Sequence, residues 1–143
     1  AETSKLNGIT IPKSRAASMI DEYPILAIAS VKAEGDTIME GVEELRYKET
    51  DRIKSICEGL KKVGVQTIDT HNSMIVKGIG PQGQINQNVE INSNLDHRIA
   101  MSFLCLGLIS EKPIKVDNTD TIKSSFPFFL DKMKKIGAKF EQL

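Results

Sequence analysis

An internal repeat constrains the fold of this chain more than any other feature. The stretch from Asp21 to Asp69 has the same order of segments as the stretch from Asp96 to Gln142: an aspartate, an apolar helical segment, a short strand, a polar loop and a second helix. The second helices end in nearly the same sequence, Lys61-Lys62-Val63-Gly64-Val65 and Lys134-Lys135-Ile136-Gly137-Ala138. The offset is 75 residues between the aspartates (96 minus 21) and 73 between the glycines (137 minus 64), so we interpret the chain as two copies of one unit.

The repeated unit reads as strand, helix, strand, helix, strand, strand. It predicts a mixed α/β (α+β) fold, with mixed sheets and buried parallel helices. A loop at 78–87, with three glycines and Pro81, separates the units, which we place at about 7–78 and about 88–143. In the first unit we expect strands at about 7–11, 36–41, 65–69 and 73–77 and helices at about 22–34 and 51–63.

The expected helices are of two kinds. Apolar residues recur on one side of 51–63, which predicts an outer helix with one buried face. Segments 25–29 and 99–109 are apolar almost all round, which is typical of helices buried in the centre of a domain. For the helix ends we expect N-caps at Asp21 and Thr50, C-terminal glycines at Gly35 and Gly64, and Pro127 in the first turn of the last helix.

The composition excludes several classes of protein. With 19 basic and 19 acidic residues the formal net charge is zero, which argues against a nucleic-acid binder. No apolar run is long enough to span a membrane, and no signal-peptide pattern is present. Cys57 and Cys105 lack paired spacing, so we expect buried free thiols in a cytoplasmic protein. Because Ala1 is not an initiator Met, we expect a piece of a longer chain.

Two charged strings lie where a loop runs into a helix, Lys48-Glu49-Thr50-Asp51-Arg52 and Asp96-His97-Arg98. Helix N-termini bind anions because unpaired N–H groups and the positive end of the helix dipole face outward. Parallel helices in a repeated fold begin at one end of the domain, so we expect both strings, Asp21 and Lys123 to converge on one rim. Arginine forks there would bind phosphate or carboxylate, and the acids would move protons. Spacing alone is also typical of solvated helix starts.

Two further candidates are open to other interpretations. His97 fits a cap residue, a metal ligand or an anion contact, and its place beside Arg98 favours the anion contact. His71 is the only other histidine and no metal-ligand spacing recurs, so we expect neither a metal nor a cofactor. Lys123 is a lone lysine in a polar loop, a position that favours plain solvent exposure.

Several strings together resemble the 5-enolpyruvylshikimate-3-phosphate synthase family, in the family's order and over essentially the whole chain. They are Met19–Pro24, Glu44–Arg52, Leu95–Phe103, Ser125–Pro127 and Ile136–Ala138. The resemblance implies a transferase of the shikimate pathway, in aromatic amino acid biosynthesis. The enolpyruvyl group of phosphoenolpyruvate passes to the 5-hydroxyl of shikimate 3-phosphate, and phosphate is released. The residues of these strings are most similar to those of the family branch with low sensitivity to glyphosate.

The resemblance also implies residue roles. Asp21 corresponds to the carboxylate that contacts the shikimate hydroxyls and helps deprotonate the attacking one, and Lys48 to the lysine that reaches the hydroxyl region. Glu49 corresponds to the acid near the phosphoenolpyruvate methylene. When the methylene is protonated, the adjacent enol ether carbon becomes cation-like. The reaction therefore needs an acid near the methylene and a base near the attacking hydroxyl. The residues that correspond to the phosphoenolpyruvate-binding set are Arg52, Arg98 and His97.

The same resemblance implies a larger protein of two domains, each with three such units, that close over the ligands. This chain then corresponds to two units of the C-terminal domain, carries half an active site and is inactive alone. Ser124 stands where some members carry an active-site lysine, and Lys123 comes one residue earlier. Three alternatives remain: an enolpyruvyl transferase acting on UDP-N-acetylglucosamine, a non-catalytic anion-binding module, and an RNA-phosphate enzyme with His97 as nucleophile.

Overall fold

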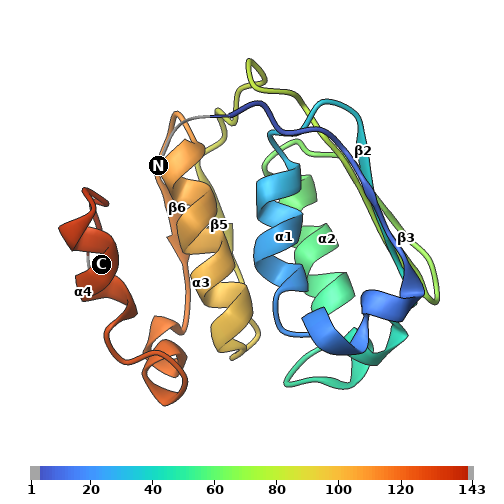
Figure 1. Ribbon diagram of the computed structural model, residues 1–143. Helices are drawn as coiled ribbons and strands as arrows, with labels where there is room; N and C mark the ends of the chain where they lie inside the picture. The colour runs from blue at the N-terminus through green and yellow to red at the C-terminus, as the bar shows by residue number, and fades with distance from the viewer. Residues whose placement is uncertain (1–3, 142–143) are drawn as a thin grey trace.

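The computed structural model describes residues 4–141, in which helices and strands form two neighbouring α/β parts (Figure 1). Residues 1–3, and residues 142–143 at the end of the second predicted unit, lie outside the described part. In chain order the elements are β1 (Thr10–Ile11), the 3-10 segments η1 (Lys13–Arg15) and η2 (Ala17–Met19), α1 (Tyr23–Ser30), β2 (Asp36–Glu40), η3 (Glu43–Tyr47), α2 (Arg52–Lys62), β3 (Thr67–Asp69), β4 (Ser73–Lys77), β5 (Val89–Ile91), α3 (His97–Leu106), η4 (Gly107–Ile109), β6 (Ile114–Val116), η5 (Thr119–Ser124) and α4 (Phe129–Lys135).

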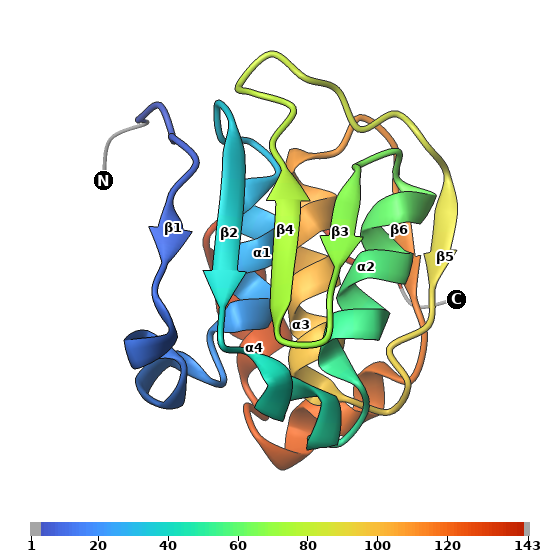
Figure 2. The ribbon, with the colours of Figure 1, turned by 90° about the vertical axis from the view of Figure 1, so that its right-hand side faces the viewer.

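The larger sheet is mixed, as the sequence predicts. Its strand order is β1-β2-β4-β3, with β1 parallel to β2 and the other pairs antiparallel. Helices α1 and α2 cover one face of this sheet (Figure 2). Side chains alternate accordingly, since Met39 and Met74 are fully buried whereas Ile38 and Ile75, on the opposite face, are partly exposed. The fold class predicted from the repeat is therefore confirmed.

The two predicted units share their order of elements. In the first, α1 connects the parallel strands β1 and β2, and in the second, α3 connects the parallel strands β5 and β6. A short 3-10 segment and a second helix follow in each, η3 and α2 in one and η5 and α4 in the other. Among residues 4–141, no strand follows α4, whereas β3 and β4 follow α2. The exact division into 7–78 and 88–143 stays a prediction.

The two second helices end in the same hydrogen-bonded motif. Gly64 and Gly137 both have left-handed backbones, with φ of 83° and 103°. The amide of the next residue donates to the carbonyl five residues back, Val65 to Leu60 and Ala138 to Met133, at 3.0 Å in each case. This is the Schellman arrangement that a glycine after a helix predicts. The C-terminal cap expected at Gly64 is confirmed, whereas Gly35 lies beyond the end of α1 in a left-handed turn before β2.

Three expected helix starts differ from the observed ones. Asp51, not Thr50, caps α2, because its extended backbone lets the carboxylate accept from the Lys54 amide at 2.9 Å. Asp21 caps nothing: α1 begins at Tyr23 with Pro24 in its first turn, where proline removes one of the amides that a cap would satisfy. Pro127 lies two residues before α4 rather than inside its first turn.

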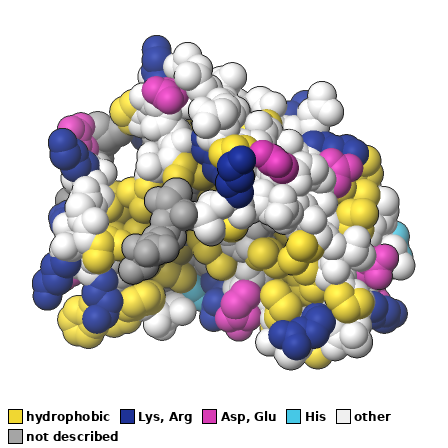
Figure 3. Space-filling model, turned by 45° about the horizontal axis from the view of Figure 1, so that its top comes forward, with side chains coloured by type: hydrophobic (Ala, Val, Ile, Leu, Met, Phe, Trp, Pro, Cys, Tyr) yellow, Lys and Arg dark blue, Asp and Glu magenta, His cyan; other side chains and the backbone are white. Residues whose placement is uncertain are grey.

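The first helices are less buried than their apolar composition predicts. They pack closely within the chain: a side chain added at Gly59 of α2 would meet the ring of Phe103 of α3 at 2.2 Å. On α1, however, Ile25 and Ala29 are exposed, because no described element covers that side of the helix. Figure 3 shows hydrophobic side chains open on the surface between the charged ones. No helix in the described part of the chain combines the length and the apolar character needed to cross a membrane.

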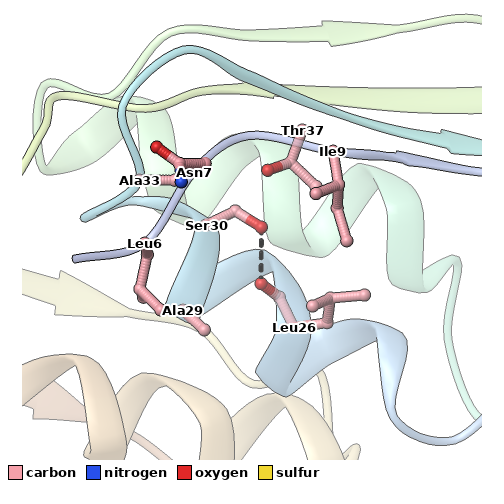
Figure 4. Close-up of a pocket in the computed structure, with 8 residues that line it drawn as sticks. All are labelled: Leu6, Asn7, Ile9, Leu26, Ala29, Ser30, Ala33 and Thr37. Carbon is pink, nitrogen blue, oxygen red and sulfur yellow. Dashed lines mark hydrogen bonds between the residues drawn. The ribbon is translucent and has the colours of Figure 1, made fainter. Parts of the chain in front are cut away.

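A shallow apolar hollow of about 140 Å³ lies between the segment leading into β1 and the helix α1 (Figure 4). Its one hydrogen bond among the drawn residues runs from the Ser30 hydroxyl to the Leu26 carbonyl, at 2.7 Å. None of the described residues that line the hollow is charged, so they offer nothing to an anion. The lining residues are Leu6, Asn7, Ile9, Leu26, Ala29, Ser30, Ala33 and Thr37.

Candidate active site

Charged side chains from three helix starts meet on one buried guanidinium, that of Arg52. Helices α1, α2 and α3 begin at the same end of the molecule (Figure 1). Arg52 is the first residue of α2 and only 1% of its side chain is exposed. Its Nε donates to Asp96 at 2.8 Å, its Nη1 to Asp21 at 2.9 Å, and its Nη2 to Glu49 at 2.7 Å. The predicted convergence of these residues on one rim is thus observed for Asp21, Glu49, Arg52 and Asp96.

Asp96 is the most deeply buried carboxylate of this cluster. It is fully buried, and its second carboxylate oxygen caps α3 by accepting from the amides of Arg98 at 2.8 Å and Ile99 at 3.3 Å. The turn before it is strained, since Asn94 and Leu95 both have left-handed backbones with φ of 52° and 61°. This turn places Asp96 where it satisfies the helix start and the arginine at once.

Asp21 bridges the two arginines of the site. It accepts from Arg52 at 2.9 Å and lies 3.2 Å from Nη2 of Arg98, whose Nη1 also donates to the Asp21 backbone carbonyl at 3.0 Å. The hydrogen bond from Arg52, aided by the charges of Arg98 and Lys48, holds the pKa of Asp21 below its ordinary value. A carboxylate with a lowered pKa is ionised at neutral pH and can accept a hydrogen bond from a hydroxyl group.

Arg52 remains charged despite its burial. Burial alone would lower the pKa of the guanidinium, but hydrogen bonds to Asp96 and Asp21 outweigh it and raise the pKa above the ordinary value. An arginine presents its donors in a planar fork that matches carboxylate and phosphate oxygens. The cluster therefore keeps a fixed positive group beneath an open rim.

A hollow of about 160 Å³ opens beside Asp21 and Arg98. Its floor is apolar and comes from α1, α3 and α4, with Ile25, Met101 and Phe129 among the lining residues. Cys105 also lines it, and burial raises the pKa of the Cys105 thiol, as it does for Cys57. Both cysteines are free, as predicted, but both are half-buried rather than buried, and both thiols are held in the weakly nucleophilic protonated form.

The other predicted site residues are not part of the cluster of hydrogen bonds. Lys48 donates to Glu44 at 2.8 Å, although its charge still contributes to the lowered pKa of Asp21. His97 begins α3, and no hydrogen bond of its ring appears among residues 4–141. Lys123 pairs with Asp120 at 2.6 Å, and both side chains are largely exposed. Within the described residues, no group of three His, Cys, Asp or Glu is placed to hold a metal ion.

Sequence reasoning missed the role of Arg46. This arginine donates to Asp51, the cap of α2, at 3.0 Å, and also to Asp69 and the Thr70 carbonyl in the hairpin between β3 and β4. It fastens that hairpin to the start of α2, where Arg52 begins. The sequence shows that Arg46 lies just before the charged string at Lys48. Its partners in the hairpin could not be predicted, because only the fold brings the hairpin next to this segment.

Comparisons with known proteins agree with this architecture. The chain superimposes on the EPSP synthase from Acinetobacter baumannii with a TM-score of 0.90 and 41% sequence identity, over 96% of this chain and 32% of that one. It also superimposes on the enolpyruvyl transferase NikO from Streptomyces tendae with a TM-score of 0.70, over 94% of this chain and 28% of that one. At 21% identity this second likeness concerns the fold alone.

Sequence comparisons identify the family. The chain is 50% identical to the 3-phosphoshikimate 1-carboxyvinyltransferase of Chelativorans sp. (strain BNC1) over 97% of its length, and 49% identical to that of Pseudomonas sp. (strain PG2982) over 96%. The family profile described as EPSP synthase (3-phosphoshikimate 1-carboxyvinyltransferase) matches residues 2–133. The chain therefore belongs to the EPSP synthase family. It spans about a third of the length of these relatives, 31% and 30% respectively.

Proposed function

We propose that this chain forms part of an enzyme that transfers the enolpyruvyl group of phosphoenolpyruvate to the 5-hydroxyl of shikimate 3-phosphate and releases phosphate. Family membership supports this reaction, since relatives of 49–50% identity are named 3-phosphoshikimate 1-carboxyvinyltransferase. One structural observation carries the proposal for this chain itself: Asp21, Glu49 and Asp96 surround Arg52 at the rim where three helices begin. An ionised base, a second acid and fixed guanidinium groups are what the reaction requires.

Each member of the cluster has a proposed role. Arg52 and Arg98 hold the anionic groups of phosphoenolpyruvate, with His97 beside them, and Lys48 reaches the hydroxyl region of shikimate 3-phosphate. Asp21, which Arg52 and Arg98 hold in position, accepts the proton of the attacking hydroxyl. Glu49 supplies the proton to the methylene carbon. Lys123 is exposed and paired with Asp120, which weakens the case for a contact with either substrate.

We also propose how this chain fits into a longer enzyme, supported by relatives of which it spans about a third. Residues 1–143 form two of the three units of a C-terminal domain, and an N-terminal domain of the same enzyme supplies the other half of the site. We expect this chain alone to be inactive. A cytoplasmic location, and membership of the branch with low glyphosate sensitivity, remain predictions of the sequence.

The reaction is tested by measuring phosphate release from phosphoenolpyruvate with and without shikimate 3-phosphate, for this chain alone and for the chain mixed with its N-terminal complement. We expect release only in the mixture and only with both substrates. Replacing shikimate 3-phosphate with UDP-N-acetylglucosamine tests the related transferase. If the folded and associated pieces bind phosphoenolpyruvate but release no phosphate with either acceptor, the site is a non-catalytic anion-binding module.

A further inference from the structure

Glu49 is the least tethered of the three carboxylates on Arg52. Asp96 is fully buried and also caps α3, so it cannot leave without exposing two amides and a charge. Asp21 lies between two arginines and contacts both. Within residues 4–141, Glu49 makes one ion pair, with Nη2 of Arg52 at 2.7 Å, and 47% of its side chain is exposed. Of the three, Glu49 can turn outward into solvent at the lowest cost.

Three of the five N–H donors of Arg52 point at carboxylates. Each of its three nitrogens donates to a carboxylate, and the guanidinium is almost completely buried. Three carboxylates face the two guanidinium groups of Arg52 and Arg98. Because the guanidinium is almost completely buried behind these carboxylates, an anion reaches its fork by taking the place of one of them.

We propose that Glu49 occupies the anion position on Arg52 in the unliganded protein and that an incoming carboxylate or phosphate group displaces it. Binding of the anion and release of the Glu49 carboxylate are then one event. This inference rests on the proposed function in one respect, that phosphoenolpyruvate is the natural anion. It adds that the Glu49 carboxylate becomes free to take up a proton from solvent, and to pass that proton to the methylene carbon, only after the arginine has exchanged Glu49 for the substrate. The Glu49 carboxylate thus becomes available only when the substrate is bound.

The displacement can be observed directly in the unmodified chain. Inorganic phosphate is titrated into the protein while the side-chain carboxyl ¹³C resonances of Asp96 and Glu49 are followed by NMR. We expect the Glu49 resonance to move with the midpoint of phosphate binding and the Asp96 resonance to stay in place. A Glu49 resonance that does not move while phosphate binds, or that moves no further than that of Asp96, would overturn the proposal.

A pair of variants tests the competition. Glu49→Gln removes the charge that holds Nη2, so phosphate affinity should rise by about two- to fivefold, as expected for the loss of one partly exposed competing ion pair. Glu58→Gln is the matched control, because Glu58 lies on the exposed side of α2 and its ion pair is with Lys54, at 4.0 Å. Its phosphate affinity should not change.

Unchanged or weaker phosphate binding by Glu49→Gln would contradict the proposal, and so would an equal gain in both variants. Phosphate is not consumed, so these results do not depend on turnover. If the phosphate-release assay fails, the proposed reaction fails, whereas the displacement of Glu49 is judged by binding alone. Because the NMR titration uses the unmodified chain, it remains decisive even if Glu49→Gln does not fold.

Discussion

Asp21 and Asp96 occupy equivalent positions in the two repeats, 75 residues apart, and both accept a hydrogen bond from Arg52, yet their surroundings differ. Asp96 is fully buried and caps α3, whereas Asp21 caps no helix and 43% of its side chain is exposed. The strained turn at Asn94 and Leu95 directs Asp96 inward, and the proline start of α1 leaves Asp21 without a capping role. The repeat thus supplies two carboxylates, and burial assigns one to stability and leaves the other available to a ligand.

The largest expected effect concerns the stability role of Asp96. Asp96→Ala should lower the free energy of unfolding by about 3–5 kcal/mol, because it leaves the Arg52 charge buried without its innermost partner and removes the cap of α3. Urea denaturation of the chain measures the loss. Asp21→Ala is the matched comparison and should cost about 1 kcal/mol or less, since its ion pairs are screened by solvent. Equal losses would remove the distinction between the two aspartates.

The next effect concerns the proposed catalytic role of Asp21. In the complete enzyme, Asp21→Asn should reduce turnover by about 100-fold or more, because the amide cannot accept the hydroxyl proton. Phosphate release under saturating substrates measures the rate, and urea denaturation at neutral pH should show a loss of about 1 kcal/mol or less. Asp36→Asn is the control: Asp36 pairs with Lys77 on the sheet and should leave turnover unchanged. A full rate in Asp21→Asn would make Asp21 a structural residue like Asp96.

A smaller effect appears as a dependence of stability on pH. The pKa of Asp21 is lowered in the folded chain, so its contribution to stability is complete above its unfolded pKa of about 4 and disappears as the pH falls through the lower folded value. The difference in unfolding free energy between the wild type and Asp21→Asn should therefore shrink as the pH is lowered from about 5 to about 2. Urea titrations across this range measure it. A constant difference would show that the Arg52 hydrogen bond does not favour ionised Asp21.

The smallest effect is expected at Lys123, outside the cluster. Its ion pair with Asp120 is exposed on both sides, so Lys123→Ala should change neither the midpoint of unfolding nor the affinity of the complete enzyme for phosphoenolpyruvate. Isothermal calorimetry measures the affinity, with Arg98→Ala as the comparison that should weaken it. A tenfold loss in Lys123→Ala would instead place this lysine in the site.

Some site features were predictable from the sequence, because they depend on local rules. The strings around Arg52 and Arg98 lie at helix starts, and parallel helices in a repeated fold bring their starts together. These rules predict that Asp21, Glu49, Arg52 and Arg98 lie close together, and in the structure they are in contact. The same local rules wrongly predicted Thr50 as the N-cap of α2. Thr50 and Asp51 are both suitable capping residues, and in the structure Asp51 is the cap.

The sequence by itself determined the repeat, the mixed fold, the glycine at each second helix end and the identity of the charged groups. These depend on periodicity and backbone sterics, which act over a few residues. Only the tertiary structure decided which carboxylate is buried, that Arg46 ties the β3–β4 hairpin to the start of α2, and that Glu49 holds the fork of Arg52. Those outcomes depend on distances between segments far apart in the chain and on the water that packing excludes, and no local pattern encodes either quantity.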